Sequence, residues 1–302
     1  MLNLHRLELL RHFARSGSIT ATAHQLGYTA SAVSQQLTVL EREAGVSLIE
    51  RTAHTASLTD AGRELAEHAG IVLTAAEEAQ SRMRARAATV SGEVDICCIP
   101  GVATDLAPSL AELQRAHPLL SIVARETSDV EAAAAVLGGQ ADLAVVDNWT
   151  EQPLPDAAGL VQQVLAREPV LLAVRDDHPD AGRSTPVGDS ALRTLLTDTT
   201  WLCAPEGLQS RMAGDRRLDA AGIDPHPRWE FEGMQVLAAL VAADAGLTFL
   251  PTTVIDAQPG IAGLPVRPRM NRRLVAFTRR SKLQDPALAA CLDTARRALG
   301  PR

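Results

Sequence analysis

The chain has 302 residues, of which 46% are hydrophobic and 22% charged, and this ordinary globular balance excludes overall disorder. The length is enough for about two domains. No apolar run approaches the ~20 residues that a membrane helix needs. Charges interrupt the N-terminal run MLNLHRLELLRHF, which is therefore not a signal peptide. We expect a protein that stays in the cytoplasm.

The net charge of −7 is unevenly distributed along the chain. Residues 1–58 hold five arginines and four acidic residues, a net charge of +1, whereas residues 59–90 carry −1 and the remainder carries −7. A weakly basic N-terminal domain still binds a phosphate backbone, above all when a dimer doubles it. The charge alone does not indicate DNA binding.

The sequence lacks the signals of a metal site, a cofactor or an enzyme. Its four cysteines, Cys97, Cys98, Cys203 and Cys291, have neither zinc-ligand nor redox-motif spacing, and buried thiols in a reducing compartment are the expected state. There is no Gly-x-Ser-x-Gly, no P-loop, no HExxH, and no GxGxxG after the first strand of the C-terminal part. We expect no catalytic role.

Three helices are predicted in the first 45 residues. Apolar residues recur at a helical period over residues 3–16, a short second helix covers about 18–26, and a third helix, capped by Thr29 or Ser31, ends at Gly45. A glycine turn at Gly27 joins the second helix to the third, as is typical of a helix-turn-helix. An αα-corner in another helical domain has the same pattern.

The outward face of the third helix is suited to DNA. With Val33, Leu37 and Leu40 facing inward, helix geometry places small or amide-bearing side chains outside. The candidate DNA contacts there are Ser31, Ser34, Gln35, Thr38 and Arg42. Gln35 fits a bidentate contact with adenine, and the hydroxyls fit bases or phosphates. An ordinary solvated face would more often carry Glu and Lys.

A wing and a long helix are predicted next. Residues 52–59 are short and polar, which indicates a hairpin, with Arg51 as a phosphate contact and His54 as a second wing candidate. From Thr59 and Asp60 a helix reaches about Ala88. Its apolar residues have heptad spacing, and the expected dimer-interface residues are Leu65, Ala69, Val72, Ala76, Ala79 and Met83. The alternative is a helix packed on its own domain.

The run TASAVSQQLTVLEREAGVSLIERTAHTASLTDAG, residues 29–62, resembles the signature of LysR-type transcription regulators. The resemblance implies a winged helix-turn-helix over residues 1–58, a linker and dimerisation helix over 59–90, and a homodimer or homotetramer. The sequence departs from the family pattern at Ala30, at Ile49 where Phe is usual, and at His54 and Ser57 where Arg is common. We therefore expect a weaker grip of the wing on the minor groove.

Residues 91–302 are predicted to form an α/β domain with two lobes. Strands at 93–99, 121–126 and 142–146 alternate with helices at 104–116 and 129–137, which implies a parallel sheet with helices on its faces. The pattern restarts with strands at 169–175, 201–203, 228–231 and 247–250 and helices at 209–221 and 234–243. A strand at 274–278 and a helix at 286–299 then return to the first lobe.

We define lobe I as about 91–162 with 268–302, and lobe II as about 163–267, hinged by chain crossings near 160–168 and 264–270. The pieces SGEVDI, LAPSLAELQRAHP, GGQADLAVV, DDHPDA and ALVAADAGLTFLP resemble the sensor domain of the same family. That resemblance implies the fold of periplasmic solute-binding proteins. The match extends over nearly the whole chain, although Ala107 stands where many relatives have a proline.

Ligands in such open sheets bind past the carboxyl ends of strands, where loops and helix starts gather. The expected effector-binding residues are Val102, Ala103, Thr104, Thr127, Ser128, Cys203, Gln209, Phe231, Glu232, Met234 and Pro251. A capping or packing role is the alternative for each. Thr104, Thr127 and Ser128, near helix starts, could bind a carboxylate. Because Glu232 is acidic, the sequence assigns no charge to the effector.

The sequence thus predicts a DNA-binding transcription regulator of the LysR type whose DNA binding a small-molecule effector modulates. Its expected partners are operator DNA, the effector, further copies of the chain and RNA polymerase. Two alternatives remain. One is a redox-sensing regulator that uses Cys203. The other is a solute-binding protein, against which the missing signal peptide and the helix-turn-helix argue.

Overall fold

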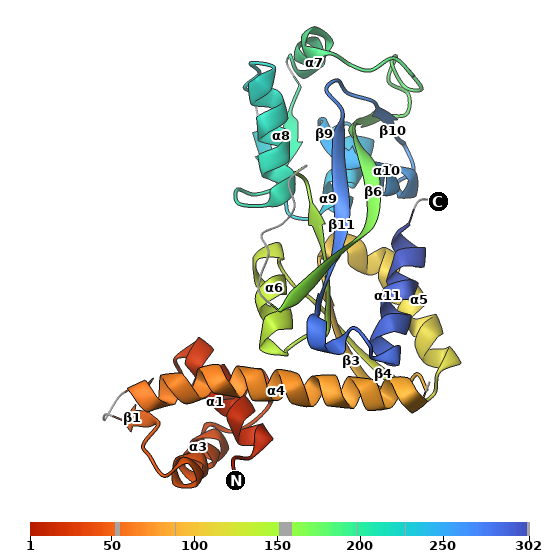
Figure 1. Cartoon of the computed structure of the whole chain (residues 1–302). Coiled ribbons are helices and arrows are strands. Elements are labelled where there is room, and N and C mark those ends of the chain that lie inside the picture. Colours follow the sequence, from red (N-terminus) through yellow and green to blue (C-terminus); the bar gives the residue numbers. More distant parts are fainter. Residues whose placement is uncertain (52–54, 88, 151–158, 198, 227, 301–302) are drawn as a thin grey trace.

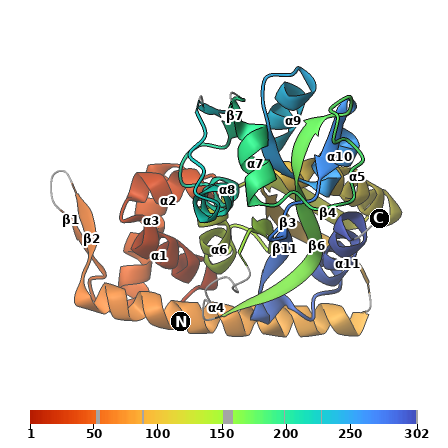
Figure 2. The ribbon, with the colours of Figure 1, turned by 90° about the horizontal axis from the view of Figure 1, so that it is seen from above.

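One long helix, α4 (Asp60–Ala87), runs along both a small N-terminal body and a larger C-terminal body in the computed structural model (Figures 1 and 2). The structure describes residues 1–51, 55–87, 89–150, 159–197, 199–226 and 228–300. Within these residues, no helix combines the length and the apolar character that crossing a bilayer requires.

Glycines and polar caps bound the three helices of the N-terminal body. Helices α1 (Leu4–Ser16), α2 (Ile19–Leu26) and α3 (Ala30–Ala44) each end at a glycine with φ between 63° and 74°, a conformation that glycine adopts without steric cost. Side-chain oxygens of Asn3, Ser18 and Thr29 accept the first free backbone N–H groups. The predicted helices are confirmed, and Thr29 rather than Ser31 caps α3.

The predicted wing is present. Strands β1 (Ile49–Arg51) and β2 (Ala56–Leu58) pair in antiparallel fashion, while the tip, including His54, lies outside the described residues. Glu41 anchors the start of the wing, because its Oε1 accepts the backbone N–H groups of Leu48 at 2.9 Å and Ile49 at 3.0 Å. The wing is therefore fixed to the C-terminal half of α3.

Helix α4 changes its environment along its length. Its first turns pack into the core of the N-terminal body, where Ala69 is 0% exposed and Leu65 is half-buried. This corrects the assignment of Ala69 to a dimer interface, because its methyl group already packs within its own chain. Farther along, Val72 is 44% and Met83 60% exposed. The alternative of a helix packed on its own domain therefore explains the apolar residues at the beginning of α4 and not the exposed ones farther along.

A seven-stranded sheet organises the C-terminal body, in the order β10-β6-β11-β5-β3-β4 with β9 also paired to β6. The predicted parallel part is confirmed: β3 lies between β4 and β5 and is parallel to both. The lobe I elements are β3 (Gly92–Cys98), α5 (Pro100–Ala116), β4 (Leu120–Glu126), α6 (Asp129–Gly138), β5 (Leu143–Asn148), η1 (Arg280–Lys282) and α11 (Pro286–Leu299).

Lobe II surrounds the other end of this sheet. Its elements are α7 (Asp189–Leu196), β7 (Trp201–Cys203), α8 (Gln209–Ala220), β8 (Arg228–Glu230), α9 (Met234–Ala242), β9 (Thr248–Pro251), α10 (Thr252–Ala257) and β10 (Ile261–Leu264). Strands β7 and β8 form a separate parallel pair. The sequence pattern does not predict α7, α10 or β10, which are too short for a clear periodic signal.

Both chain crossings between the lobes are strands. The first lies in β6 where it is expected, near 160–168, whereas the second is β11 and lies later in the chain than the expected 264–270. β6 (Leu160–Arg175) is one 16-residue strand, and β11 (Met270–Arg279) pairs with it in antiparallel fashion with a register shift at Leu274/Val275. Figure 1 shows both strands running from one lobe to the other. Gln162, Gln163 and Arg167 interrupt the apolar pattern of β6, so its first half is not recognisable as a strand.

Gly62 in the first turn of α4 tests how closely this helix packs. A Cβ at Gly62 would lie 2.1 Å from the carbonyl oxygen of Leu48, whereas a Cβ at Gly70 in the same helix would meet no atom within 4 Å. We expect Gly62→Ala to destabilise the protein by about 1–3 kcal/mol through overpacking. Gly70→Ala should stabilise it by about 1 kcal/mol through helix propensity. Urea denaturation followed by circular dichroism measures both, and equal effects would contradict this packing.

Candidate nucleic-acid interface and ligand cavity

The outward face predicted for α3 is present. Ser31, Gln35 and Arg42 are exposed, and Ser34 and Thr38 are half-buried beside them. Val33, Leu37 and Leu40 are buried on the opposite face, in the core of the N-terminal body. The amide of Gln35 is therefore free to approach another molecule, while the body behind it keeps α3 in place.

Arg51 of the wing is folded against α3. Its Nη1 donates to Ser34 Oγ at 2.6 Å, and its Nη2 donates to Thr38 Oγ1 at 3.1 Å. Thr38 in turn donates to the backbone oxygen of Ser34 at 3.0 Å. The two hydroxyls thus hold a positive charge at the junction of helix and wing.

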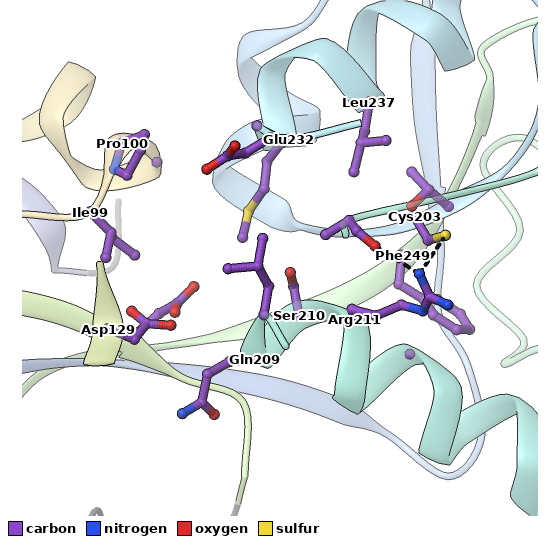
Figure 3. A pocket seen from close by; sticks show the side chains of 18 of the residues that line it. Ile99, Pro100, Asp129, Cys203, Gln209, Ser210, Arg211, Glu232, Leu237 and Phe249 are labelled. Atoms are coloured by element: carbon purple, nitrogen blue, oxygen red, sulfur yellow. Dashed lines mark hydrogen bonds between the residues drawn. The ribbon is translucent and has the colours of Figure 1, made fainter. Parts of the chain in front are cut away.

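A cavity of about 380 Å³ lies between lobe I and lobe II. Lobe I contributes segments 99–101 and 126–129 and Asp147, which follow the carboxyl ends of β3, β4 and β5 or lie near them. Lobe II contributes segments 201–204, 208–211 and 232–234 with Gly214, Leu237, Thr248 and Phe249 (Figure 3). The volume lies in the range of small-molecule sites.

Six of the eleven residues expected to bind an effector line this cavity: Thr127, Ser128, Cys203, Gln209, Glu232 and Met234. Val102, Ala103, Thr104, Phe231 and Pro251 do not. Helix α5 begins at Pro100, four residues earlier than predicted, so its first turn faces the cavity and Thr104 is exposed away from it. Val102 is buried in the lobe I core, and Ala103 packs against that core.

The other two corrections lie in lobe II. Pro251 pairs with Val170 in the sheet and ends β9. The backbone N–H of Phe231 donates to the backbone oxygen of Cys203 at 3.0 Å, while the Phe231 side chain is 39% exposed outside the cavity. In both cases the residue next to the carboxyl end of a strand points away from the space between the lobes.

Sequence reasoning missed three carboxyl groups in the cavity wall, those of Glu126, Asp129 and Asp147. Asp129 has a buried Oδ1 without a hydrogen-bond partner among the described residues. Burial, and to a lesser extent Asp147, raise its pKa to about 7. Asp147 accepts hydrogen bonds from Trp149 Nε1 at 2.6 Å and Arg272 Nη1 at 3.4 Å. Asp129 directly follows the expected effector-binding residue Ser128, and Asp147 lies one residue past the predicted end of β5. Including one further residue after each of these positions would predict both acids.

Arg211, also missed, is a cation in the wall whose donors are already used. It is 5% exposed and donates to Glu230 at 2.7 Å, Asp215 at 2.6 Å and the backbone oxygen of Ala204 at 2.9 Å. Figure 3 shows it turned toward Cys203, whose Sγ lies 3.4 Å from Nη1. Burial raises the pKa of the Cys203 thiol, and Arg211 opposes this effect. All four cysteines are buried and free.

Comparison with known proteins supplies independent findings. Residues 87–300 match the family model of the LysR substrate binding domain, and residues 4–63 match that of the bacterial regulatory helix-turn-helix protein, LysR family. The nitrogen assimilation regulatory protein nac of Klebsiella aerogenes is 30% identical, over 86% of this chain and 82% of its own length.

Two further similarities extend over most of the chain. A hydrogen peroxide-inducible genes activator of Escherichia coli O157:H7 is 27% identical, over 90% of this chain and 88% of its own length. The structure of a full-length OxyR variant from Pseudomonas aeruginosa aligns with a TM-score of 0.70 at 21% identity, over 98% of this chain and 95% of that one. At this identity, the structural match shows a shared fold.

The raised pKa of Asp129 predicts a pH-dependent stability. The folded protein holds this proton up to about pH 7, whereas an unfolded aspartate loses it near 3.8, so the stability of the wild type falls as the pH rises between these values. Asp129→Asn cannot ionise. We expect its Tm relative to that of the wild type to rise by a few degrees between about pH 5 and about pH 8, because the wild type loses stability over this range and the variant does not.

Asp293→Asn is the control, because the Asp293 side chain is exposed on α11, where it pairs with Arg296, and does not line the cavity. Its Tm relative to the wild type should not change between the two pH values. A Tm difference for Asp129→Asn that is the same at both pH values would contradict a buried, proton-holding carboxyl group.

Proposed function

The chain belongs to the LysR family of bacterial transcription regulators, and from that premise we propose how it contacts DNA and senses an effector. It is a DNA-binding transcription regulator with an effector-binding domain, and its relatives are regulators. The proposal keeps the domain boundaries 1–58, 59–90 and 91–302. A regulator acts where the chromosome is, so we also propose a cytoplasmic location.

We propose that α3 enters the major groove with Gln35 on a base edge and Arg51 on a phosphate. The observation that carries this proposal is the exposed Gln35 beside an arginine that Ser34 and Thr38 already hold in place. An amide gives base selectivity, and a guanidinium gives affinity that does not depend on the sequence. Ser31, Arg42 and the wing residue His54 are proposed as flanking contacts.

We propose that the exposed part of α4 pairs with α4 of a second copy. Val72, Ala79 and Met83 are exposed there at heptad spacing, and Ala76 is half-buried on the same stripe. Apolar side chains in such a row gain free energy when a partner helix buries them. Pairing would place two α3 helices on one DNA site, and two dimers would form the family's tetramer. RNA polymerase remains a further proposed partner.

Helix α6 supports a link between effector and DNA. Its first turn lines the cavity, while Arg11 Nη2 of α1 donates to Gly138 O and Arg15 Nη2 donates to Leu137 O, both at 3.2 Å, at its last turn. These cations lie at the negative end of the helix dipole. A ten-residue helix is a rigid connection of about 15 Å, so a shift at the cavity reaches the N-terminal body.

Sensing of hydrogen peroxide is a second candidate, which the names of relatives and the Arg211 contact to Cys203 favour. A peroxide-reactive cysteine is an accessible thiolate. Cys203 is almost fully buried, and burial raises its pKa. The other three cysteines are also buried, and the pKa of each is raised as well. Effector binding in the cavity is therefore the preferred function.

The DNA proposal is tested with two variants in mobility-shift titrations. Gln35→Ala should lose about 1–3 kcal/mol on the operator and relax the preference at one base pair. Arg51→Ala should weaken all sequences alike and reduce the salt dependence by about one unit of log–log slope. If both variants lose affinity equally for operator and random DNA, Gln35 does not contact a base.

The dimer proposal is tested by charge in the exposed stripe. Val72→Asp and Met83→Asp would bury a carboxylate between two helices, which costs several kcal/mol, and should dissociate the oligomer in sedimentation velocity. Thr74→Asp is the control, because Thr74 is exposed two residues beyond Val72, on the opposite side of α4. A Val72→Asp protein that sediments like the wild type would remove this stripe from the interface.

A further inference from the structure

The cavity between the lobes is apolar over much of its wall. Ile99 and Pro100 face it from lobe I, and Leu208, Leu237 and Phe249 face it from lobe II. Such walls bind the hydrocarbon part of a ligand through burial of apolar area, while a few polar groups fix its orientation. The chemical class of the ligand therefore depends on the charges among these walls.

Those charges are predominantly negative. The charged side chains among the described lining residues are Glu126, Asp129, Asp147, Glu232 and Arg211. The one cation, Arg211, already pairs with Glu230 and Asp215. Glu126, Asp129 and Glu232 have no ion-pair partner among the described residues, and Figure 3 places Asp129 and Glu232 on opposite sides of the same space.

Asp147, which also lines the cavity, adds to this excess of negative charge. Its partner Arg272 is 2% exposed and also pairs with Glu168, so one guanidinium lies between two carboxyl groups. Among the described lining residues, no positive charge is left unpaired to attract an anion. The buried Oδ1 of Asp129 has no donor among the residues that the structure describes, and an unpaired buried acceptor is unfavourable until a ligand supplies a donor.

The two helix starts that lobe I contributes to the cavity, those of α6 and α5, do not offset these acids. Asp129 and Glu131 occupy the first turn of α6, so carboxylates of the chain already face its positive end. The Ser128 hydroxyl accepts from the Glu131 backbone N–H at 3.4 Å and donates to Glu131 Oε2 at 3.0 Å. Helix α5 begins at Pro100, which has no N–H. The carboxylate site considered for Thr127 and Ser128 is thus disfavoured.

We propose that the effector is a small amphipathic cation, such as a protonated amine on an apolar frame, whose N–H groups donate to Asp129 while the apolar part packs between Leu237, Phe249 and Ile99. This inference rests on the proposed effector function of the cavity. Glu232 on the opposite wall adds attraction for the same charge. An amine placed there satisfies the buried Oδ1 of Asp129, which has no hydrogen-bond partner among the described residues.

Three probes of matched shape test this charge preference on the full-length protein: 3-phenylpropan-1-amine, 3-phenylpropan-1-ol and 3-phenylpropanoate. Calorimetry at about pH 8 keeps the amine protonated and Asp129 ionised. We expect the amine to bind about tenfold more tightly than the alcohol, and the carboxylate to bind most weakly. Between about pH 8 and pH 6 the advantage of the amine should shrink as Asp129 gains its proton.

Asp129→Asn should lower the affinity for the amine about tenfold and leave that for the alcohol unchanged. Glu112→Gln is the control, because Glu112 is exposed on α5 and outside the cavity. Tightest binding of the carboxylate, equal binding of amine and alcohol, or no binding of the amine would each overturn the cation proposal. The pH comparison reads Asp129 together with the other charged groups in the cavity wall and behind it. These groups are Glu126, Asp147, Glu168, Arg211, Glu232 and Arg272.

A mobility-shift titration with each bound probe separates this inference from the proposed function. If the amine binds with the expected preference but leaves operator affinity unchanged, the cation class is supported and regulation through the cavity is overturned. If the carboxylate instead binds and shifts operator affinity, regulation through the cavity stands and the cation class is wrong.

Discussion

The buried guanidinium of Arg279, at the end of β11, determines how the parts of this molecule are arranged. It donates to Glu77 of α4 at 3.1 Å, to Asp142 at 2.7 Å, and to the backbone oxygens of Val136 and Ala141 at 2.5 and 2.7 Å. A buried charge is tolerated only when it is fully paired, and loss of one partner typically costs about 3–5 kcal/mol. The long helix, the end of α6 and the sheet are therefore held together through one side chain.

A second constraint acts on the cavity. Because β6 and β11 pass between the lobes as a paired ladder, lobe closure must twist or bend hydrogen-bonded strands, and free rotation about two loops is excluded. Motions of small amplitude are then expected, and a ligand acts by favouring one of two nearby arrangements. The register shift at Leu274/Val275 is the place where this ladder is already irregular.

What the sequence predicts well is local in origin. Gly17, Gly27 and Gly45 end helices because the residue type itself permits the left-handed conformation, and no distant contact is needed. The burial of Ala69 is different, because α1 covers it and the heptad pattern of α4 contains no sign of that neighbour. Pro100 is a usable signal for a helix start, because proline favours the first helical position, although the apolar run of residues 96–99 before it favours a strand. The sequence predicts Glu232 at the cavity from its place after a strand, whereas the burial that leaves Asp129 without a hydrogen-bond partner among the described residues depends on tertiary packing and has no local signal.

In the coupling proposed above, helix α6 contacts the effector at its first turn and the DNA-binding body at its last turn. The end at the cavity contributes side chains, which an amino-acid substitution replaces. The end at α1 contributes backbone carbonyl groups, which do not depend on the residue type. Gene duplicates of such a regulator can therefore diverge in the compound to which they respond while Arg11 and Arg15 keep their contacts. An engineer who wants a new biosensor can vary the first turn of α6 and the facing wall of lobe II and leave the output machinery untouched.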